Sequence, residues 1–308
     1  MKLPLKVNLV EVGPRDGFQA VSGFIPTTEK EEIVRGLHNS GLSRLEITSV
    51  VSKRAVPQLS DARSIIEVGN QLDTCLTQVL VPNVKYAERA LDFGAKKLVF
   101  VLSASPSHNY RNVLLSIKDS LTELREVLSL HPSNASLRVN IATALDCPFE
   151  GVTPSSNVTN LIEKILTMSS NIELAICDTT GRCTPDKVAQ LFSHLISVFD
   201  DQDWVFHAHD TFGTGVANCL AAWHEGIDTF DCSVAGLGGC PFAPGSSGNV
   251  ATEDLVWLFE AMSVDTGVQM EKLLEVANQV GRIPAALTGG RVRHALSNQQ
   301  NQTRLGVS

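Results

Sequence analysis

Short apolar segments alternate with longer segments of helical periodicity along most of the chain. The apolar segments are four to eight residues long, rich in β-branched side chains and bounded by turn-forming residues, a pattern typical of buried strands. The segments predicted as strands are Val7–Val12, Arg44–Thr48, Thr74–Val81, Lys97–Leu102, Leu137–Ala144, Ile172–Cys177, Trp204–His209 and Thr229–Val234.

A helical pattern follows each predicted strand. The first helix, Glu29–Asn39, has its start marked by Pro26-Thr27-Thr28. Strands that alternate with helices in this way imply a parallel sheet, and eight such units within about 230 residues favour a closed (β/α)8 TIM barrel over about 7–235. The other predicted helices lie near 61–71, 84–93, 112–130, 155–169, 185–199 and 215–225.

An open, doubly wound sheet is the competing architecture. The turn after the first strand, Gly13-Pro-Arg-Asp-Gly17, lacks the dinucleotide-binding glycine fingerprint and so disfavours it. No linker divides the chain, so we expect one catalytic domain over 1–308. A glycine-rich loop and additional C-terminal helices, near 250–262 and 269–280, would occupy about 236–296. The Gln- and Asn-rich segment from Ser297 is predicted to fray or to take part in packing.

Composition narrows the class of protein. The 308 residues are 43% hydrophobic and 19% charged, with a formal net charge of −8 and no long Lys/Arg run. These values predict a globular protein with a small-molecule partner and argue against a nucleic-acid groove or a membrane surface. The strand at Val7 and the lack of a long apolar run lead us to expect neither a targeting peptide nor a membrane span.

Seven cysteines are present, an odd number without paired metal-ligand spacing. Several lie inside apolar segments. We therefore predict free thiols in a reducing, cytoplasmic compartment. The seven are Cys75, Cys147, Cys177, Cys183, Cys219, Cys232 and Cys240.

Polar side chains stand at the carboxyl ends of several predicted strands, which in a TIM barrel meet on the face that carries the chemistry. His207 and His209 are separated by one residue, so both imidazoles point to the same side of their strand and can converge inside the barrel mouth. The other candidates at or near strand ends are Glu11, Arg15, Asp16, Gln19, Glu46 and Asp178.

One interpretation of this group is a metal site. Asp16, His207, His209 and the amide oxygen of Asn249 would form a mixed nitrogen and oxygen set that suits Mg²⁺ or Mn²⁺. Zinc would more often recruit the nearby thiol of Cys240. The alternative is a pair of barrel histidines whose hydrogen bonds are satisfied without a metal.

Arg15 also has two readings. It is either part of a salt-bridged turn at the barrel rim or a fixed cation aimed at negative charge that develops in a reaction. A buried carboxylate needs a partner, so Glu46 is expected to support the site by orienting Arg15 or a ligand. Asp178 could have the same supporting role.

The stretch Gly236–Asn249 contains five glycines and predicts a loop that can bend and approach a ligand closely. A thiol, Cys240, stands in its middle. A cysteine in such a polar, glycine-rich segment does not fill a core, which suggests a chemical role. The alternative is a plain turn with an incidental cysteine.

Three motifs together resemble the 3-hydroxy-3-methylglutaryl-CoA lyase family. They are Val10-Glu-Val-Gly-Pro-Arg-Asp-Gly-Phe-Gln19, His207-Ala-His-Asp210, and Ser233-Val-Ala-Gly-Leu-Gly-Gly-Cys-Pro-Phe242 followed by Gly248-Asn-Val-Ala-Thr-Glu-Asp254. The first two also occur in wider relatives, the acyl-CoA condensing synthases and pyruvate-type aldolases. The cysteine loop is the specific part, and the similarity covers about residues 7 to 281.

The resemblance implies a TIM barrel, often a homodimer, that cleaves 3-hydroxy-3-methylglutaryl-CoA to acetyl-CoA and acetoacetate. It implies a divalent metal, Mg²⁺ or Mn²⁺, held by Asp16, His207, His209 and Asn249. It further implies that Arg15 and Cys240 are catalytic, with a base among His207 and Asp16. Glu46, Asp178 and Gln19 would support the site.

The sequence departs from the family pattern in two places. Ala20-Val21 stand where the family commonly has Asn-Glu, and Pro106-Ser-His-Asn-Tyr110 stand where an acidic residue and an aromatic are usual. Both stretches follow predicted strands and could line the acyl pocket. A lyase for a different 3-substituted 3-hydroxyacyl-CoA is therefore an alternative. A metal-dependent synthase that condenses an acyl-CoA with an α-keto acid and a non-catalytic barrel are the others.

Overall fold

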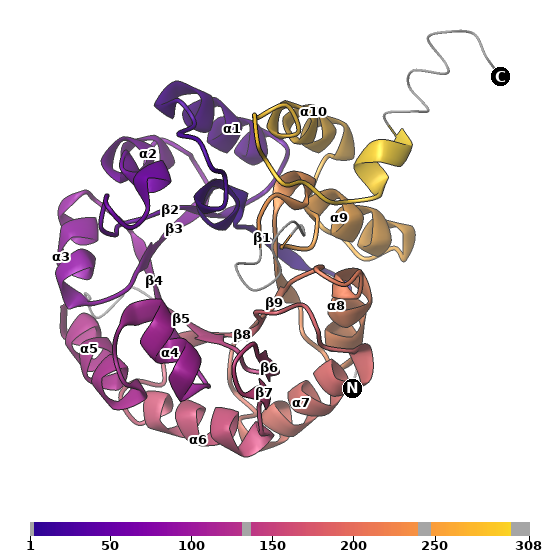
Figure 1. Ribbon diagram of the computed structural model, residues 1–308. Coiled ribbons are helices and arrows are strands. Elements are labelled where there is room, and N and C mark those ends of the chain that lie inside the picture. Colours follow the sequence, from indigo (N-terminus) through magenta and orange to yellow (C-terminus); the bar gives the residue numbers. More distant parts are fainter. Residues whose placement is uncertain (1–2, 131–136, 240–247, 297–308) are drawn as a thin grey trace, which may run out of the picture.

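The computed structural model describes residues 3–130, 137–239 and 248–296. Eight parallel strands form a closed barrel in the order β1-β10-β9-β8-β5-β4-β3-β2 (Figure 1). The predicted (β/α)8 TIM barrel is therefore confirmed. Its strands are β1 Asn8–Glu11, β2 Arg44–Ser49, β3 Leu76–Val81, β4 Lys97–Ser103, β5 Leu137–Ala142, β8 Ile172–Asp178, β9 Trp204–Ala208 and β10 Thr229–Cys232.

Helices surround this barrel, and two more follow its last strand (Figure 1). Each ring helix buries one apolar stripe; α1, for example, buries Ile33, Val34 and Leu37. The turn after α1 needs Gly41, whose φ is +103° and whose missing Cβ would meet a backbone oxygen at 2.3 Å. The helices are α1 Thr27–Asn39, α2 Ala62–Gly69, α3 Val84–Asp92, α4 Pro106–Val113, α5 Ile117–Leu130, α6 Ser155–Leu166, α7 Pro185–Val198, α8 Gly215–His224, α9 Thr252–Ala261 and α10 Met270–Val280.

The helix predicted near 112–130 is confirmed as α5, but its predicted start is wrong, and the separate helix α4 was not predicted. The chain forms α4 first, breaks at Leu114 with φ +60°, and restarts as α5. The side chain of Asn109 stabilises the break, because its amide nitrogen donates to the carbonyl of Leu115 and to the Ser120 hydroxyl, each at 2.8 Å. Ser105 caps the start of α4 by accepting from the amide of His108 at 3.2 Å.

Several short elements were not predicted. Strands β6 Asp146–Cys147 and β7 Gly151–Val152 form a small hairpin after β5, which ends at Ala142 because Thr143 has φ +54°. A short π-helical turn, η1, spans Gly13–Gly17 directly after β1. The other two are 3₁₀ turns, η2 Pro57–Leu59 and η3 Val234–Gly236.

The main apolar core lies between the barrel and its helices, whereas the barrel interior carries charged and amide side chains beside a small apolar cluster of Ala175, Cys177 and Val205. On β5, the core residues Val139 and Ile141 alternate with Arg138 and Asn140. Period-two alternation places the latter pair on the inner face of the barrel. Within the described residues, no helix is both long and apolar enough to cross a membrane.

Candidate active site

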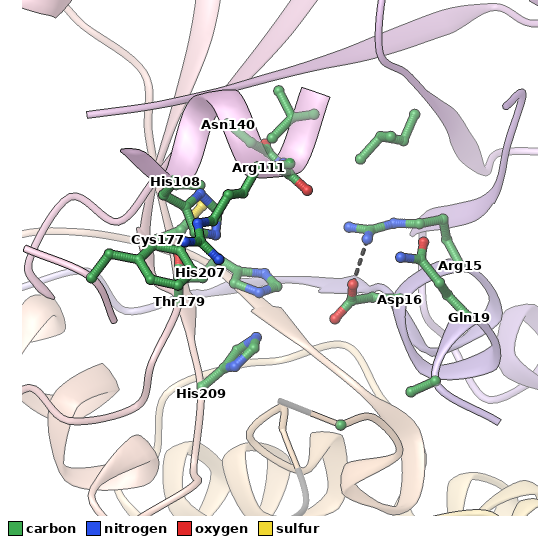
Figure 2. Close-up of a pocket in the computed structure, with 17 residues that line it drawn as sticks. Arg15, Asp16, Gln19, His108, Arg111, Asn140, Cys177, Thr179, His207 and His209 are labelled. Carbon is green, nitrogen blue, oxygen red and sulfur yellow. Dashed lines mark hydrogen bonds and ion pairs between the residues drawn. The ribbon is translucent and has the colours of Figure 1, made fainter. Parts of the chain in front are cut away.

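A cavity of about 690 Å³ opens at the carboxyl ends of the barrel strands (Figure 2). Side chains from both ends of the sequence converge on it, because the closed barrel brings β1 beside β10 and β9. Its lining residues are Arg15, Asp16, Gln19, Ala20, Leu80, Val101, His108, Arg111, Asn112, Asn140, Ala142, Phe149, Cys177, Thr179, His207, His209 and Gly239.

The turn η1 presents Arg15 and Asp16 to this cavity. The Arg15 guanidinium forms ion pairs with Glu46 on β2 and with Asp16, and its side chain is only 8% exposed. The second oxygen of Glu46 accepts from the amide of Gln78 at 2.9 Å. The supporting position predicted for Glu46 therefore agrees with its contacts, since it fixes the arginine from below.

The charges around Asp16 keep it ionised. Burial alone would raise the pKa of its carboxyl, but the neighbouring Arg15, His207 and His209 outweigh burial and lower that pKa to about 2. Asp16 is therefore a carboxylate across the physiological pH range. That state suits a metal ligand and makes Asp16 a weak base.

Asp16, His207 and His209 form a cluster that can hold a metal ion. Their candidate ligand atoms all lie within 4.8 Å of one another. Figure 2 shows both imidazoles on the side of the cavity that faces Asp16. The i, i+2 spacing on β9 thus produces the convergence that the sequence predicted.

Each imidazole has a ring nitrogen that could bind a metal. The Nδ1 of His209 is buried and has no hydrogen-bond partner among the described residues. Burial and the nearby His207 lower the pKa of His209 to about 4, so its ring is neutral at pH 7. In His207, Nδ1 pairs with Asp231 at 2.9 Å, which leaves Nε2 for the cavity side. These residues fit a divalent cation, because a buried imidazole nitrogen without a hydrogen-bond partner, His209 Nδ1, stands beside the ionised carboxylate of Asp16.

Asn249 lies next to the cluster. Its amide nitrogen donates to Asp16 at 2.8 Å and to the Leu237 carbonyl at 3.2 Å. A backbone hydrogen bond from Asp210 to Gly248, at 2.7 Å, holds this segment against the end of β9. The amide nitrogen of Asn249, not its oxygen, thus faces Asp16, and the ligand role of the oxygen stays a prediction.

Three other predicted residues, Gln19, Asp178 and Cys240, differ in where the chain places them. Gln19 lies beside Arg15 on the cavity wall (Figure 2). Asp178 accepts hydrogen bonds from the backbone amides of Gly181 and Cys183, at 3.1 and 3.2 Å, and so organises the turn after β8. Burial raises its pKa to about 6. Cys240 falls outside the described residues, although the preceding Gly239 lines the cavity.

Sequence reasoning missed the layer beneath the site. Asp231, on β10, bonds to His207 and also pairs with Arg138 on β5. Arg138 in turn donates to Asn140 at 2.7 Å. Charged residues inside otherwise apolar strands could have revealed them, but the sequence does not say whether they face a shared interior.

The two departures from the family pattern have different outcomes. Ala20 lines the cavity, whereas Val21 is buried in the hydrophobic core. The stretch after Ser103 forms α4, and its His108 lines the cavity with Nδ1 bonded to the Ser103 hydroxyl at 2.7 Å. One residue of each stretch, therefore, can influence what the cavity accepts.

The HMGL-like family model matches residues 6–280. The chain belongs to the HMGL-like family. A hydroxymethylglutaryl-CoA lyase of Bacillus subtilis is 38% identical over 91% of this chain and 94% of its own length. The mitochondrial hydroxymethylglutaryl-CoA lyase of Arabidopsis thaliana is 36% identical over 96% of this chain, which spans 64% of that longer relative.

Solved structures of this family share the barrel. The Bacillus subtilis HMG-CoA lyase has a TM-score of 0.92 at 36% identity, with 96% of this chain and 100% of that chain covered. An HMG-CoA lyase from Acinetobacter baumannii, in complex with coenzyme A and 3-methylmalate, has a TM-score of 0.89 at 33% identity and covers 96% of both chains.

Proposed function

We propose that this protein is a carbon–carbon lyase that cleaves 3-hydroxy-3-methylglutaryl-CoA to acetyl-CoA and acetoacetate. The observation that carries the proposal is the convergence of Arg15 with the Asp16, His207 and His209 cluster on one cavity of an HMGL-like barrel. The coenzyme A in the Acinetobacter structure supports an acyl-CoA substrate. Two further parts of the proposal are a cytoplasmic location, which rests on the unpaired cysteines, and a homodimer, which rests on the resemblance.

The reaction requires a base, a cation and an acid. The base removes the C3 hydroxyl proton, the C2–C3 bond breaks, and its electron pair moves onto the acetyl fragment as a thioester enolate. Protonation of that carbon gives acetyl-CoA, while C3 becomes the ketone of acetoacetate. Bound at Asp16, His207, His209 and Asn249, Mg²⁺ or Mn²⁺ would lower the pKa of the substrate hydroxyl.

The side chains of the site match these needs. Arg15, fixed by Glu46 and Asp16, can stabilise the enolate oxygen without reorganising. Of the two candidate bases, the pKa of about 2 disfavours Asp16. His207 can take the proton only at Nε2 and only while that nitrogen does not hold the cation, because its Nδ1 is bonded to Asp231. We propose that Cys240 protonates the carbanion, because the cavity wall continues into its loop at Gly239.

The first test is metal dependence. Removing divalent ions with a chelator should abolish turnover, and Mg²⁺ or Mn²⁺ should restore it, since the ligand set consists of a carboxylate, imidazoles and an amide. Product formation is measured by mass spectrometry. Full activity in excess chelator, with no metal found by elemental analysis, would refute the metal site.

A second test separates binding from catalysis. His207→Ala or His209→Ala should weaken metal binding, whereas Arg15→Gln should retain the metal and lower kcat by about 10²-fold or more. Bound metal is counted by elemental analysis after dialysis. Equal metal loss in all three variants would contradict this division of roles.

A different acyl chain is the second candidate function, and the observation that favours it is the polar wall on α4. His108 lines the cavity there. Arg111 and Phe149 also line it, and the Arg111 guanidinium carbon lies 4.3 Å from the centre of the Phe149 ring. If this wall selects the substrate, analogues with another C3 substituent should exceed the methyl compound in kcat/KM, by about 10–200-fold per methylene. A clear preference for the methyl compound would remove this candidate.

The same assays include acetyl-CoA with α-keto acids. Condensed product from that mixture, without cleavage of any 3-hydroxyacyl-CoA, would instead identify a synthase.

A further inference from the structure

Arg138 is among the largest fully buried side chains of the molecule, and it lies inside the barrel beneath the cavity. Its Nη1 donates to Asp231 at 2.8 Å, and Nη2 forms an ion pair with the second oxygen of the same carboxylate. Strands β8 and β9 separate β5 from β10 in the barrel order, so this bidentate pair crosses the barrel interior. The guanidinium therefore ties together two walls that share no backbone hydrogen bonds.

Each partner of Arg138 reaches a different part of the site. Asp231 Oδ2 also pairs with His207 Nδ1 at 2.9 Å, so the arginine and the histidine share one oxygen. On the other side, Arg138 Nε donates to the Asn140 oxygen at 2.7 Å. With its oxygen engaged there, Asn140 turns its amide nitrogen away from Arg138, and Asn140 itself lines the cavity (Figure 2).

The charges of this interior are paired in two layers. Near the amino ends of the strands, Glu173 pairs with Arg44 at 2.6 Å and with Lys97 at 2.8 Å. Above them lies the Arg138–Asp231 pair, whose side chains are 0% and 1% exposed. Burial lowers the pKa of Lys97, although Glu173 opposes that effect. Arg138 stays charged because Asp231 and Glu173 offset the effect of burial on its pKa.

Stability alone does not account for such a pair. Replacing a buried ion pair with apolar side chains of similar volume is often neutral or stabilising, whereas loss of one partner is strongly destabilising. A hydrogen-bonded carboxylate behind a ligating imidazole, however, fixes its tautomer and orientation. Arg138 and His207 bond to the same oxygen of Asp231, so Arg138 holds the carboxylate that orients the imidazole.

We propose that Arg138 is a positioning residue for both sides of the site. Through Asp231 it holds His207 with Nε2 toward the divalent cation, and through Asn140 it directs an amide N–H toward the acyl portion of the substrate. The proposal deepens the proposed function and rests on it for the substrate; the cation-binding half can be tested separately.

The experiment compares Mn²⁺ affinity, measured by electron paramagnetic resonance, with thermal stability. The key variant is Arg138→Met/Asp231→Leu, which leaves no buried charge unpaired and is expected to fold. Its Mn²⁺ Kd should rise about 10–100-fold although its Tm is retained. Arg138→Gln and Asp231→Asn should each give a similar rise, and their combination should add little, because they act on one imidazole.

Asp61→Asn is the matched control, since it breaks the buried Lys30–Asp61 ion pair, at 2.9 Å, which involves neither Arg138 nor Asp231. It should lower Tm and leave the Mn²⁺ Kd unchanged. Asn140→Ala should leave that Kd unchanged but alter KM for the acyl-CoA. An unchanged Kd in Arg138→Met/Asp231→Leu, or a rise as large in Asp61→Asn, would overturn the positioning role.

The outcomes also separate this inference from the proposed function. Wild-type protein that cleaves 3-hydroxy-3-methylglutaryl-CoA while Arg138→Met/Asp231→Leu binds Mn²⁺ normally would refute the positioning role alone. If the wild-type protein cleaves no acyl-CoA, but Arg138→Met/Asp231→Leu shows the expected loss of Mn²⁺ affinity, the proposed reaction is refuted and the positioning of His207 is supported.

Discussion

Arg15 and Asp16 are adjacent residues of opposite charge, and the turn that follows β1 holds both beside the histidines of β9. The guanidinium is paired on two sides, so little motion remains to be lost when charge develops near it. That preorganisation is what an oxyanion-stabilising group requires. The proposed role of Cys240 has the opposite requirement, since a proton donor on a glycine-rich segment would have to approach the carbanion after the bond has broken.

Cys240→Ser tests that role. The serine retains the approximate size of the thiol but is a far weaker acid than a group of pKa ~8.5, so kcat should fall steeply while KM and metal content change little. Alkylation of the wild-type thiol should inactivate the enzyme, and bound substrate should slow it. Normal turnover by Cys240→Ser, or activity after alkylation at residue 240, would rule out the proton donor.

At this scale, the sequence predicted the residues at strand ends but not those beneath them. His207 and His209 could be paired because a strand fixes the direction of residues i and i+2. Asp231 and Arg138 lie 93 positions apart and meet only because the barrel closes. Glu11 was noted at a strand end. It accepts from the nearby amide of Gly13, but its other partners, the Val234 amide and the Thr252 hydroxyl, come from distant C-terminal segments.

At the scale of elements, the helix predicted near 112–130 starts later than expected, at Ile117, for a local reason. Leu114 has no feature of a helix breaker, but the Asn109 side chain bonds to the backbone beyond it and ends α4. The periodicity of apolar residues does not reveal a side chain that competes in this way for the backbone hydrogen bonds of a helix. The long, regular helices such as α7 and α10 were predicted closely, because a continuous apolar stripe determines them.

The left-handed Leu114 yields a stability prediction. A non-glycine residue in that conformation costs about 1–2 kcal/mol, and Leu114 is 74% exposed, so Leu114→Gly loses little packing. The free energy of unfolding of Leu114→Gly, measured with urea, should rise by up to about 1 kcal/mol. This figure includes the greater conformational entropy that glycine gives the unfolded chain. Leu5→Gly is the control, since Leu5 is 69% exposed but not left-handed, and it should give no gain.

At the scale of the whole molecule, the barrel separates stability from chemistry. The apolar layer between strands and helices holds the fold together, while the interior carries charges that lead from Glu173 up to the cavity. The alternation of apolar and helical segments predicted the strands, and the number and spacing of the strand–helix units predicted that the sheet closes into a barrel. This alternation could not predict the polar interior, because a strand buried on both faces gives no indication of which face meets the barrel axis.

The last prediction concerns a buried acid behind the C-terminal segments. Glu253, at the start of α9, is fully buried; one oxygen accepts from the amide of Ala235 at 3.0 Å, and the other lies 3.9 Å from Arg293 Nε. Burial raises its pKa to about 8. Because the folded pKa exceeds the value of about 4.3 expected for the unfolded chain, the folded state retains the proton more strongly.

The stabilisation from that proton is fully present below about pH 4 and is lost as pH rises through about 8. The wild-type Tm should therefore fall between pH 6 and pH 9, and Glu253→Gln, which mimics the protonated acid, should flatten that part of the profile. Differential scanning calorimetry across the range measures both. Glu275→Gln on α10, an exposed acid, serves as the control and should follow the wild type. Parallel profiles for wild type and Glu253→Gln would mean that Glu253 is already ionised at pH 6 and that Arg293, despite its distance, compensates its charge.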